Sequence, residues 1–297
     1  MDSPLRSVER RSHRLIGHRP SEAAHAQSII RRADGRIVEL KAHRAHWSGR
    51  YPDNSLDGLR ECFAEGVARA EIDFRLWTGE FVITHDEPGR ETRPARLGEA
   101  LAIVRDAAPG PTVLMLDAKD VVPWARETAV RLAGLIAPVR ERVFVGSPAD
   151  WNLRRLRAAD STVALAFDPG YYLDRKRSDS PLPGREGAYG YHDAHPLAFR
   201  RSIPVSEYLR ERVEGLLGLV PGIRELHVNL TLFEQMLDDG FAALAVAHDA
   251  GVAIDVWTLD AGTPRWQERL ARALDAGVDI VTTNTPRDLA RAASDRD

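Results

Sequence analysis

The sequence contains a single cysteine, Cys62, among 297 residues. One cysteine excludes a disulfide within the chain and a zinc site built from cysteine thiolates. Cys62 falls on the apolar side of an expected helix, where it is interpreted as a small buried hydrophobe. The chain also has no apolar run long enough to span a bilayer and no apolar segment typical of a secretion signal near its start. A cytoplasmic protein without membrane contact is therefore expected.

Positive charge is not in excess, because the formal net charge is −3. This balance argues against a nucleic-acid partner. Lysine occurs three times among 41 basic residues, so the other 38 are arginine. We attribute that bias to GC-rich coding DNA. Residues 1–36 form an arginine-rich N-terminal arm. We interpret the arm as a packed or loosely ordered extension rather than a surface for membranes or nucleic acid.

Short apolar segments alternate with longer segments of helical period along residues 37–297. Strict β–α alternation is typical of a parallel sheet, and eight units in this length fit a single-domain (β/α)8 TIM barrel. An open doubly wound sheet is the alternative, but no GxGxxG motif follows the first strand. The eight expected strands are 37–44, 70–76, 112–119, 142–147, 162–168, 223–230, 252–259 and 279–284.

A long polar loop, residues 169–203, follows the fifth expected strand and is rich in Gly, Pro, Tyr and Arg. Compact domains rarely carry so long a loop unless it is functional or disordered. We expect this segment to cover the site as a lid.

Carboxylates gather at the ends of the second and third expected strands, where barrel active sites lie. Glu71 and Asp73 are two residues apart and therefore share one face of a strand. Such a pair repels unless it binds a proton or a cation. Asp117 on the next strand adds a third carboxylate, and Lys119 on the same face can neutralise a phosphate. Oxygen ligands alone favour a divalent cation such as Mg²⁺ or Ca²⁺. A rim network of ion pairs is the alternative.

Two histidines, His43 and His85, flank Glu71 and Asp73 in the sequence. Histidine titrates near neutral pH, so one ring can accept a proton while the other donates one across a phosphodiester. Arg44 supplies a planar fork that suits phosphate. His227 and Asn229, at the end of the sixth expected strand, are further candidates for substrate contact.

Together these motifs resemble the glycerophosphodiester phosphodiesterase family over about residues 37–290. The matching segments are His43-Arg44-Ala45 with Pro52-Asp53-Asn54-Ser55, Glu71-Ile72-Asp73, His85-Asp86, Asp117-Ala118-Lys119, Trp257-Thr258, Gly277-Val278-Asp279 and Thr283-Asn284-Thr285-Pro286. The resemblance implies a (β/α)8 barrel that cleaves a small or lipid-derived phosphodiester. It implies these roles: Glu71, Asp73 and Asp117 as ligands of a divalent cation, His43 and His85 as the acid–base or nucleophilic pair, Arg44 and Lys119 as phosphate ligands, and Trp257 as a flat apolar wall.

The sequence departs from the family pattern at three places. Ala45 replaces the usual glycine after His-Arg, and Asp53 replaces a glutamate. Only residues 87–96 stand where the family inserts a small substrate-binding subdomain. The specificity for glycerophosphodiesters is therefore open.

Two other functions fit the same motifs. The D-x-K motif, the missing insertion and the T-N-x-P ending are similar to sphingomyelinase D-like phospholipases, which expel the alcohol by internal attack and leave a cyclic phosphate. A barrel recruited to bind or convert another phosphorylated ligand in a biosynthetic pathway is the second alternative. The sequence leaves open the alcohol, the metal, which histidine is the base, and the oligomeric state.

Overall fold

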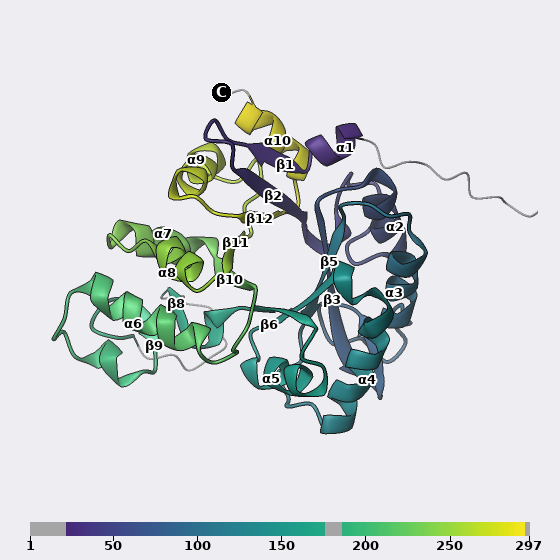
Figure 1. The fold of residues 1–297 in the computed structure, drawn as a ribbon, viewed down its shortest axis with the longest axis horizontal. Coiled ribbons are helices and arrows are strands. Elements are labelled where there is room, and N and C mark those ends of the chain that lie inside the picture. The colour runs from purple at the N-terminus through teal and green to yellow at the C-terminus, as the bar shows by residue number, and fades with distance from the viewer. Residues whose placement is uncertain (1–21, 176–185, 295–297) are drawn as a thin grey trace, which may run out of the picture.

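Eight parallel strands close into a barrel in the computed structural model, which describes residues 22–175 and 186–294. The ring closes because the last strand pairs with the first and the first pairs with the next strand of the barrel. The predicted (β/α)8 barrel is thereby confirmed (Figure 1). In ring order the strands are β2 (Ile37–Ala42), β3 (Arg69–Trp77), β5 (Val113–Ala118), β6 (Val143–Ser147), β7 (Ala164–Phe167), β10 (Glu225–Asn229), β11 (Ala253–Trp257) and β12 (Ile280–Thr283).

Helices cover the outside of the barrel (Figure 1). Two helices rather than one connect the sixth and seventh barrel strands, because the chain breaks at Gly240, whose φ of 74° no regular helix adopts. No helix in the described part of the chain is long and apolar enough to cross a membrane. The helices are α2 (Leu56–Glu65), α3 (Leu97–Asp106), α4 (Arg126–Ile136), α5 (Asp150–Ala159), α6 (Val205–Leu217), α7 (Leu230–Asp238), α8 (Ala243–Asp249), α9 (Trp266–Ala276) and α10 (Pro286–Ser294).

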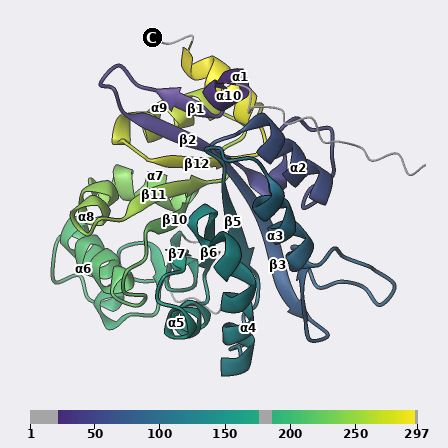
Figure 2. The ribbon, with the colours of Figure 1, turned by 45° about the vertical axis from the view of Figure 1, so that its right-hand side comes forward.

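Two additions to the (β/α)8 pattern pair with the first two strands of the barrel. A short helix α1 (Glu22–Ala26) leads into β1 (Ile29–Arg31), which pairs antiparallel with the start of β2. The C-terminal half of the predicted arm is therefore packed, and residues 1–21 lie outside the described residues. The other addition is β4 (Glu80–Ile83), which folds back on β3 as an antiparallel hairpin. Figure 2 shows β3 running on beyond the neighbouring strands.

The interior of the barrel is polar, although the layer between strands and helices is apolar. Along β2, Leu40 belongs to the hydrophobic core, and the next residue, Lys41, is 1% exposed and bonds to Asp255. Arg69 likewise bonds to Glu225 inside the barrel. Alternation along β2, β3, β10 and β11 thus sends apolar side chains to the helices and charged ones inward.

The segment 169–203, expected as a loop, carries a small sheet of its own. A 3₁₀ turn, η3 (Pro169–Tyr171), precedes β8 (Leu173–Arg175), which pairs antiparallel with β9 (Tyr191–Asp193). Residues 176–185 of the expected loop lie outside the described residues. At the end of β9, the buried carboxylate of Asp193 accepts hydrogen bonds from Tyr208 and Arg212 of α6. This contact attaches the segment to the barrel.

The Asp193→Ala variant tests this attachment. It leaves the guanidinium of Arg212, which is 8% exposed, without its partner. Breaking a buried charge pair in this way is expected to lower the free energy of unfolding by about 3–5 kcal/mol. Denaturant unfolding measures the change. The matched control is Asp288→Ala, whose pair with Arg291 is exposed and contributes at most about 0.5 kcal/mol. Equal losses in the two variants would contradict the attachment.

Candidate active site

A cavity of about 620 Å³ opens at the C-terminal ends of the barrel strands, within the size range of small-molecule sites. The structure brings together nine of the ten predicted site residues around it. The tenth, Asp73, is fully buried and pairs with Arg44 and Lys119, two of the lining residues. The nine lining residues are His43, Arg44, Glu71, His85, Asp117, Lys119, His227, Asn229 and Trp257.

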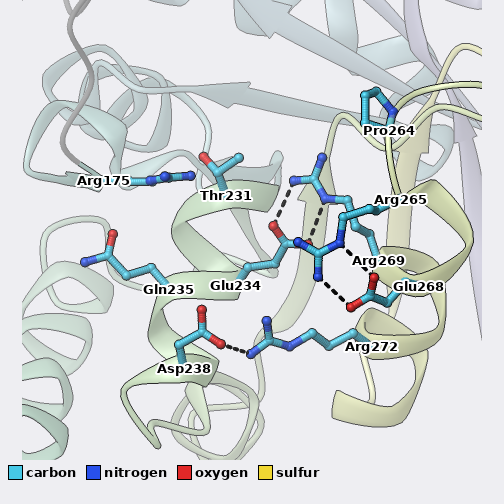
Figure 3. Close-up of a pocket in the computed structure, with 10 residues that line it drawn as sticks. All are labelled: Arg175, Thr231, Glu234, Gln235, Asp238, Pro264, Arg265, Glu268, Arg269 and Arg272. Carbon is cyan, nitrogen blue, oxygen red and sulfur yellow. Dashed lines mark hydrogen bonds and ion pairs between the residues drawn. The ribbon is translucent and has the colours of Figure 1, made fainter.

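A second hollow of about 610 Å³ lies on the surface between α7 and α9 (Figure 3). It is rich in arginine, but carboxylates cancel the charge of the arginines that α9 and its N-terminus contribute. The pairs are Arg269 with Glu234, Arg265 with Glu268 and Arg272 with Asp238. The barrel mouth is the stronger candidate for a substrate site because nine of the ten predicted site residues line it and none lines this hollow.

Three carboxylates form a cluster in the wall of the cavity. One oxygen each of Glu71, Asp73 and Asp117 lies within 4.8 Å of the other two. Strand register brings them together, because Asp73 on β3 is directly beside Asp117 on β5. Within the described residues, the buried Oε1 of Glu71 has no hydrogen-bond partner. An all-oxygen cluster with an unpaired buried acceptor fits a divalent cation.

The ionisation of the cluster reflects its crowded negative charge. Burial, together with the charges of Asp73 and Asp117, raises the pKa of Glu71 well above its usual value. Burial would also raise the pKa of Asp73, but Lys119 and the amide of Asn54 outweigh it and hold that pKa below its usual value. Burial alone would lower the pKa of Lys119, but the surrounding carboxylates outweigh burial and raise the pKa of its ammonium. Without a cation, Glu71 therefore holds a proton more readily than Asp73.

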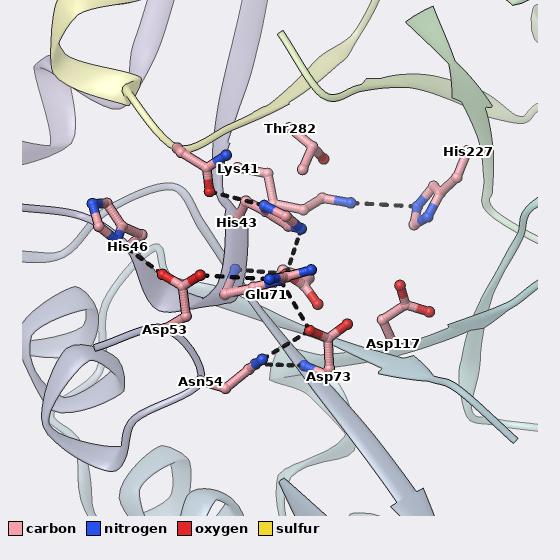
Figure 4. Close-up of polar contacts among 12 residues, drawn as sticks. Lys41, His43, His46, Asp53, Asn54, Glu71, Asp73, Asp117, His227 and Thr282 are labelled. Carbon is pink, nitrogen blue, oxygen red and sulfur yellow. Dashed lines mark hydrogen bonds and ion pairs between the residues drawn. The ribbon is translucent and has the colours of Figure 1, made fainter. Parts of the chain in front are cut away.

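Two left-handed turns shape the loop that supports the cluster, and Figure 4 shows Asn54 of this loop in contact with Asp73. Asn54, with φ of 57°, donates its amide to Asp73 Oδ2 and accepts the Asp73 backbone N–H, both at 2.8 Å. In the 3₁₀ turn η1 (His43–Ala45), the Arg44 backbone N–H donates to Glu71 Oε2 at 2.7 Å. Ala45 has φ of 56°, a region that favours glycine and costs other residues roughly 1–2 kcal/mol. The replacement noted in the sequence thus occurs at a strained position.

A chain of hydrogen bonds orients His43. The side-chain amide of Asn284 donates to Asp260 at 2.8 Å, so its oxygen faces His43 Nδ1 at 2.9 Å. These donors assign the proton to Nδ1 and leave the Nε2 lone pair free. Burial lowers the pKa of His43, which favours the neutral ring, and Nε2 lies 4.0 Å from Glu71 Oε2. The ring is therefore arranged to accept a proton at Nε2.

His85 lines the same cavity from the chain that follows the β3–β4 hairpin. Its Nδ1 lies 2.8 Å from a carboxylate oxygen of Asp86. The His85 side chain is 42% exposed, against 21% for His43. The two histidines therefore occupy different settings, one enclosed and one open to water.

Several functional candidates escaped the sequence analysis. Lys41, Asp255 and Thr282 lie on the cavity floor, each two residues before a strand-end residue named above. The period of two along a strand is the sequence signal that could have identified them. Asp168, the residue that ends the fifth expected strand, also lines the cavity, and burial raises its pKa to about 7. Its Oδ1 accepts the Gly170 N–H at 2.8 Å.

The fold and the site define a class, a (β/α)8 barrel with a carboxylate cluster and two histidines at its mouth. No model of a protein family matches the sequence. No curated protein sequence matches it either.

Solved structures of glycerophosphodiester phosphodiesterases share the fold. The enzyme from Parabacteroides distasonis superposes with a TM-score of 0.60 at 15% identity, over 86% of this chain and 97% of that chain. The enzyme from Agrobacterium tumefaciens has a TM-score of 0.54 at 13% identity, over 85% and 99%. An Oleispira antarctica phosphodiesterase in complex with the product sn-glycerol-3-phosphate has a TM-score of 0.55 at 17% identity, over 86% and 96%. The expected likeness to this family is thus confirmed for the fold.

The ionisation of Asp168 predicts a pH-dependent stability. A carboxyl whose pKa rises from 3.8 to about 7 on folding destabilises the fold as pH increases between those values. The full shift corresponds to an upper bound of about 4 kcal/mol, and water in the cavity reduces it. The Asp168→Asn variant should therefore gain about 1–3 kcal/mol over wild type near pH 8.5 and little near pH 4. Thermal unfolding in EDTA measures the difference, with the exposed Asp275→Asn as control. A gain that is equal at both pH values would refute the burial of this charge.

Proposed function

We propose that the protein is a metal-dependent phosphodiesterase of the glycerophosphodiester phosphodiesterase type. The observation that carries the proposal is the buried, unpaired Oε1 of Glu71 inside a cluster of three carboxylates. Glu71, Asp73 and Asp117 would hold Mg²⁺ or Ca²⁺. A cation bound there would supply Lewis-acid polarisation of a phosphoryl oxygen.

Lys119 and Arg44 supply positive charge beside the cluster. The Lys119 ammonium lies 2.6 Å from Asp117 Oδ2 and 3.0 Å from Asp73 Oδ1, and it also lines the cavity. Arg44 Nε is 3.2 Å from Asp73 Oδ2, and one terminal nitrogen is 3.5 Å from Asp53. Both cations are held by carboxylates, so they are pre-positioned for a phosphate that enters the cavity. The product-bound Oleispira structure supports a small phosphate ligand for this barrel.

His43 is the better candidate for the base. The Nδ1–H group of His43 donates a hydrogen bond to the side-chain oxygen of Asn284. Nε2 can therefore take a proton from an attacking hydroxyl or water. His85, on the open side, would donate a proton to the departing alcohol. The nucleophile decides the product, because water gives an open monoester and a neighbouring substrate hydroxyl gives a cyclic phosphate. Phosphorus NMR of the product distinguishes these two outcomes.

Hydrolysis of bis(p-nitrophenyl) phosphate tests the reaction class. EDTA is expected to abolish turnover and added Mg²⁺ or Ca²⁺ to restore it. His43→Gln should lower kcat by about 10²–10⁴-fold, the usual contribution of a general base. His248→Gln is the matched control, because its ring pairs with Asp279 and does not line the cavity. Activity that survives EDTA, or that is equal in the two variants, would contradict the proposal.

Cation binding itself should depend on pH. The cation competes with the proton that the raised pKa of Glu71 favours, so affinity rises as pH increases. Isothermal calorimetry with Mg²⁺ or Ca²⁺ should also detect proton release, through heats that change with the ionisation enthalpy of the buffer. Glu71→Gln should weaken binding and remove this dependence. If Glu71→Gln binds cations as wild type does, the assigned ligand set is wrong.

A further inference from the structure

The surface hollow between α7 and α9 shares a wall with the cavity at the barrel mouth. Along β8, Asp174 lines the mouth cavity and the next residue, Arg175, lines the hollow. In the first turn of α7, Leu232 lines the cavity and Thr231 lines the hollow. Neighbouring residues on a strand or a helix point in different directions, so one thin layer of chain borders both spaces. We call β8 and the first turn of α7 the shared wall.

Positive charge exceeds negative charge among the residues that line the hollow. Four arginines face three carboxylates, and each carboxylate pairs with Arg265 or with an arginine of α9. The fourth arginine is Arg175, whose guanidinium has no hydrogen-bond or ion-pair partner within residues 22–175 and 186–294. Figure 3 shows Arg175 approaching the hollow from the side opposite α9. A cationic ligand would meet this unpaired charge, whereas an anion would neutralise it.

Two of the paired arginines remain available to a ligand, because their ion pairs are exposed. The side chains of Arg265 and Glu268 are 72% and 61% exposed, and those of Arg272 and Asp238 are 37% and 66% exposed. Exposed ion pairs contribute about 1 kcal/mol or less to stability. A bound anion can therefore share these guanidiniums at little cost.

The chemistry of the arginines favours phosphate over carboxylate. A carboxylate ligand would offer the same group that already pairs with these arginines. A phosphate monoester carries up to two negative charges and three acceptor oxygens, so it can bond to more than one guanidinium at once. The hollow, at about 610 Å³, is within the size range of small-molecule sites.

We propose that the hollow is a second binding site, for a small phosphate-bearing anion held by Arg175 and Arg265, and that its occupancy stabilises the shared wall. The anion would bind the side chain of Arg175 and thereby hold β8 in place. Because the same strand presents Asp174 to the barrel mouth, a ligand in the hollow acts on a wall of the candidate active site. This inference goes beyond the proposed function and does not depend on it.

Isothermal calorimetry with inorganic pyrophosphate tests the site, in EDTA so that the barrel mouth holds no cation. Wild type should bind pyrophosphate. Arg175→Gln and Arg265→Gln should each weaken binding about fivefold or more, the effect of losing roughly one hydrogen bond to a charged group.

Two variants locate the binding. Arg291→Gln is matched to Arg265→Gln, because Arg291 also pairs with a carboxylate three residues away and is similarly exposed, yet it does not line the hollow. Arg44→Gln removes a guanidinium from the barrel mouth. Both should bind pyrophosphate as wild type does. No binding by wild type, equal binding by Arg175→Gln and Arg291→Gln, or a loss in Arg44→Gln would overturn the site.

Amide hydrogen exchange tests the effect on the shared wall. Pyrophosphate at ten times its Kd should slow exchange of the β8 amides about tenfold in wild type, if opening of the wall releases the ligand. Arg175→Gln at the same concentration should show about twofold slowing or less. Equal slowing in both proteins, or none in wild type, would overturn the stabilisation of the wall. These readouts need no turnover, so they stand or fall separately from diesterase activity.

Discussion

Repulsion among three carboxylates is the constraint on which this site depends. The register of β3 against β5 places Asp73 beside Asp117, and strand alternation adds Glu71 on the same face. The groups around the cluster reduce that repulsion. Lys119 and Arg44 bring positive charge, the Asn54 amide donates a hydrogen bond to Asp73, and η1 donates a backbone N–H to Glu71. The left-handed turns near the mouth are the backbone conformations that place these donors.

The barrel interior is divided by charge. The side formed by β3 and β5 holds the crowded carboxylates, while the side formed by β2, β10, β11 and β12 holds matched pairs such as Lys41 with Asp255. The first arrangement gathers oxygen ligands of the kind that divalent cations bind, and the second pairs Lys41 with carboxylates from two other strands.

Sequence periodicity predicted the barrel and its mouth better than its floor. Strands and helices alternate clearly in the sequence. In this fold, a polar residue at the C-terminal end of an apolar strand lies at the barrel mouth. Nine such predictions meet at the cavity. Lys41 and Asp255 were missed because each is mid-strand and its partner lies 214 residues away, a pairing that only ring closure creates.

The contact between His43 and Asn284 joins residues 241 positions apart. It depends on the pairing of β12 with β2, which is the step that closes the ring. A growing chain carries His43 and the three carboxylates early, but the orientation of the histidine waits for Asp260 and Asn284. The orientation of His43 therefore requires the closed ring, whereas the pairing of β3 with β5 that gathers the three carboxylates does not involve β12.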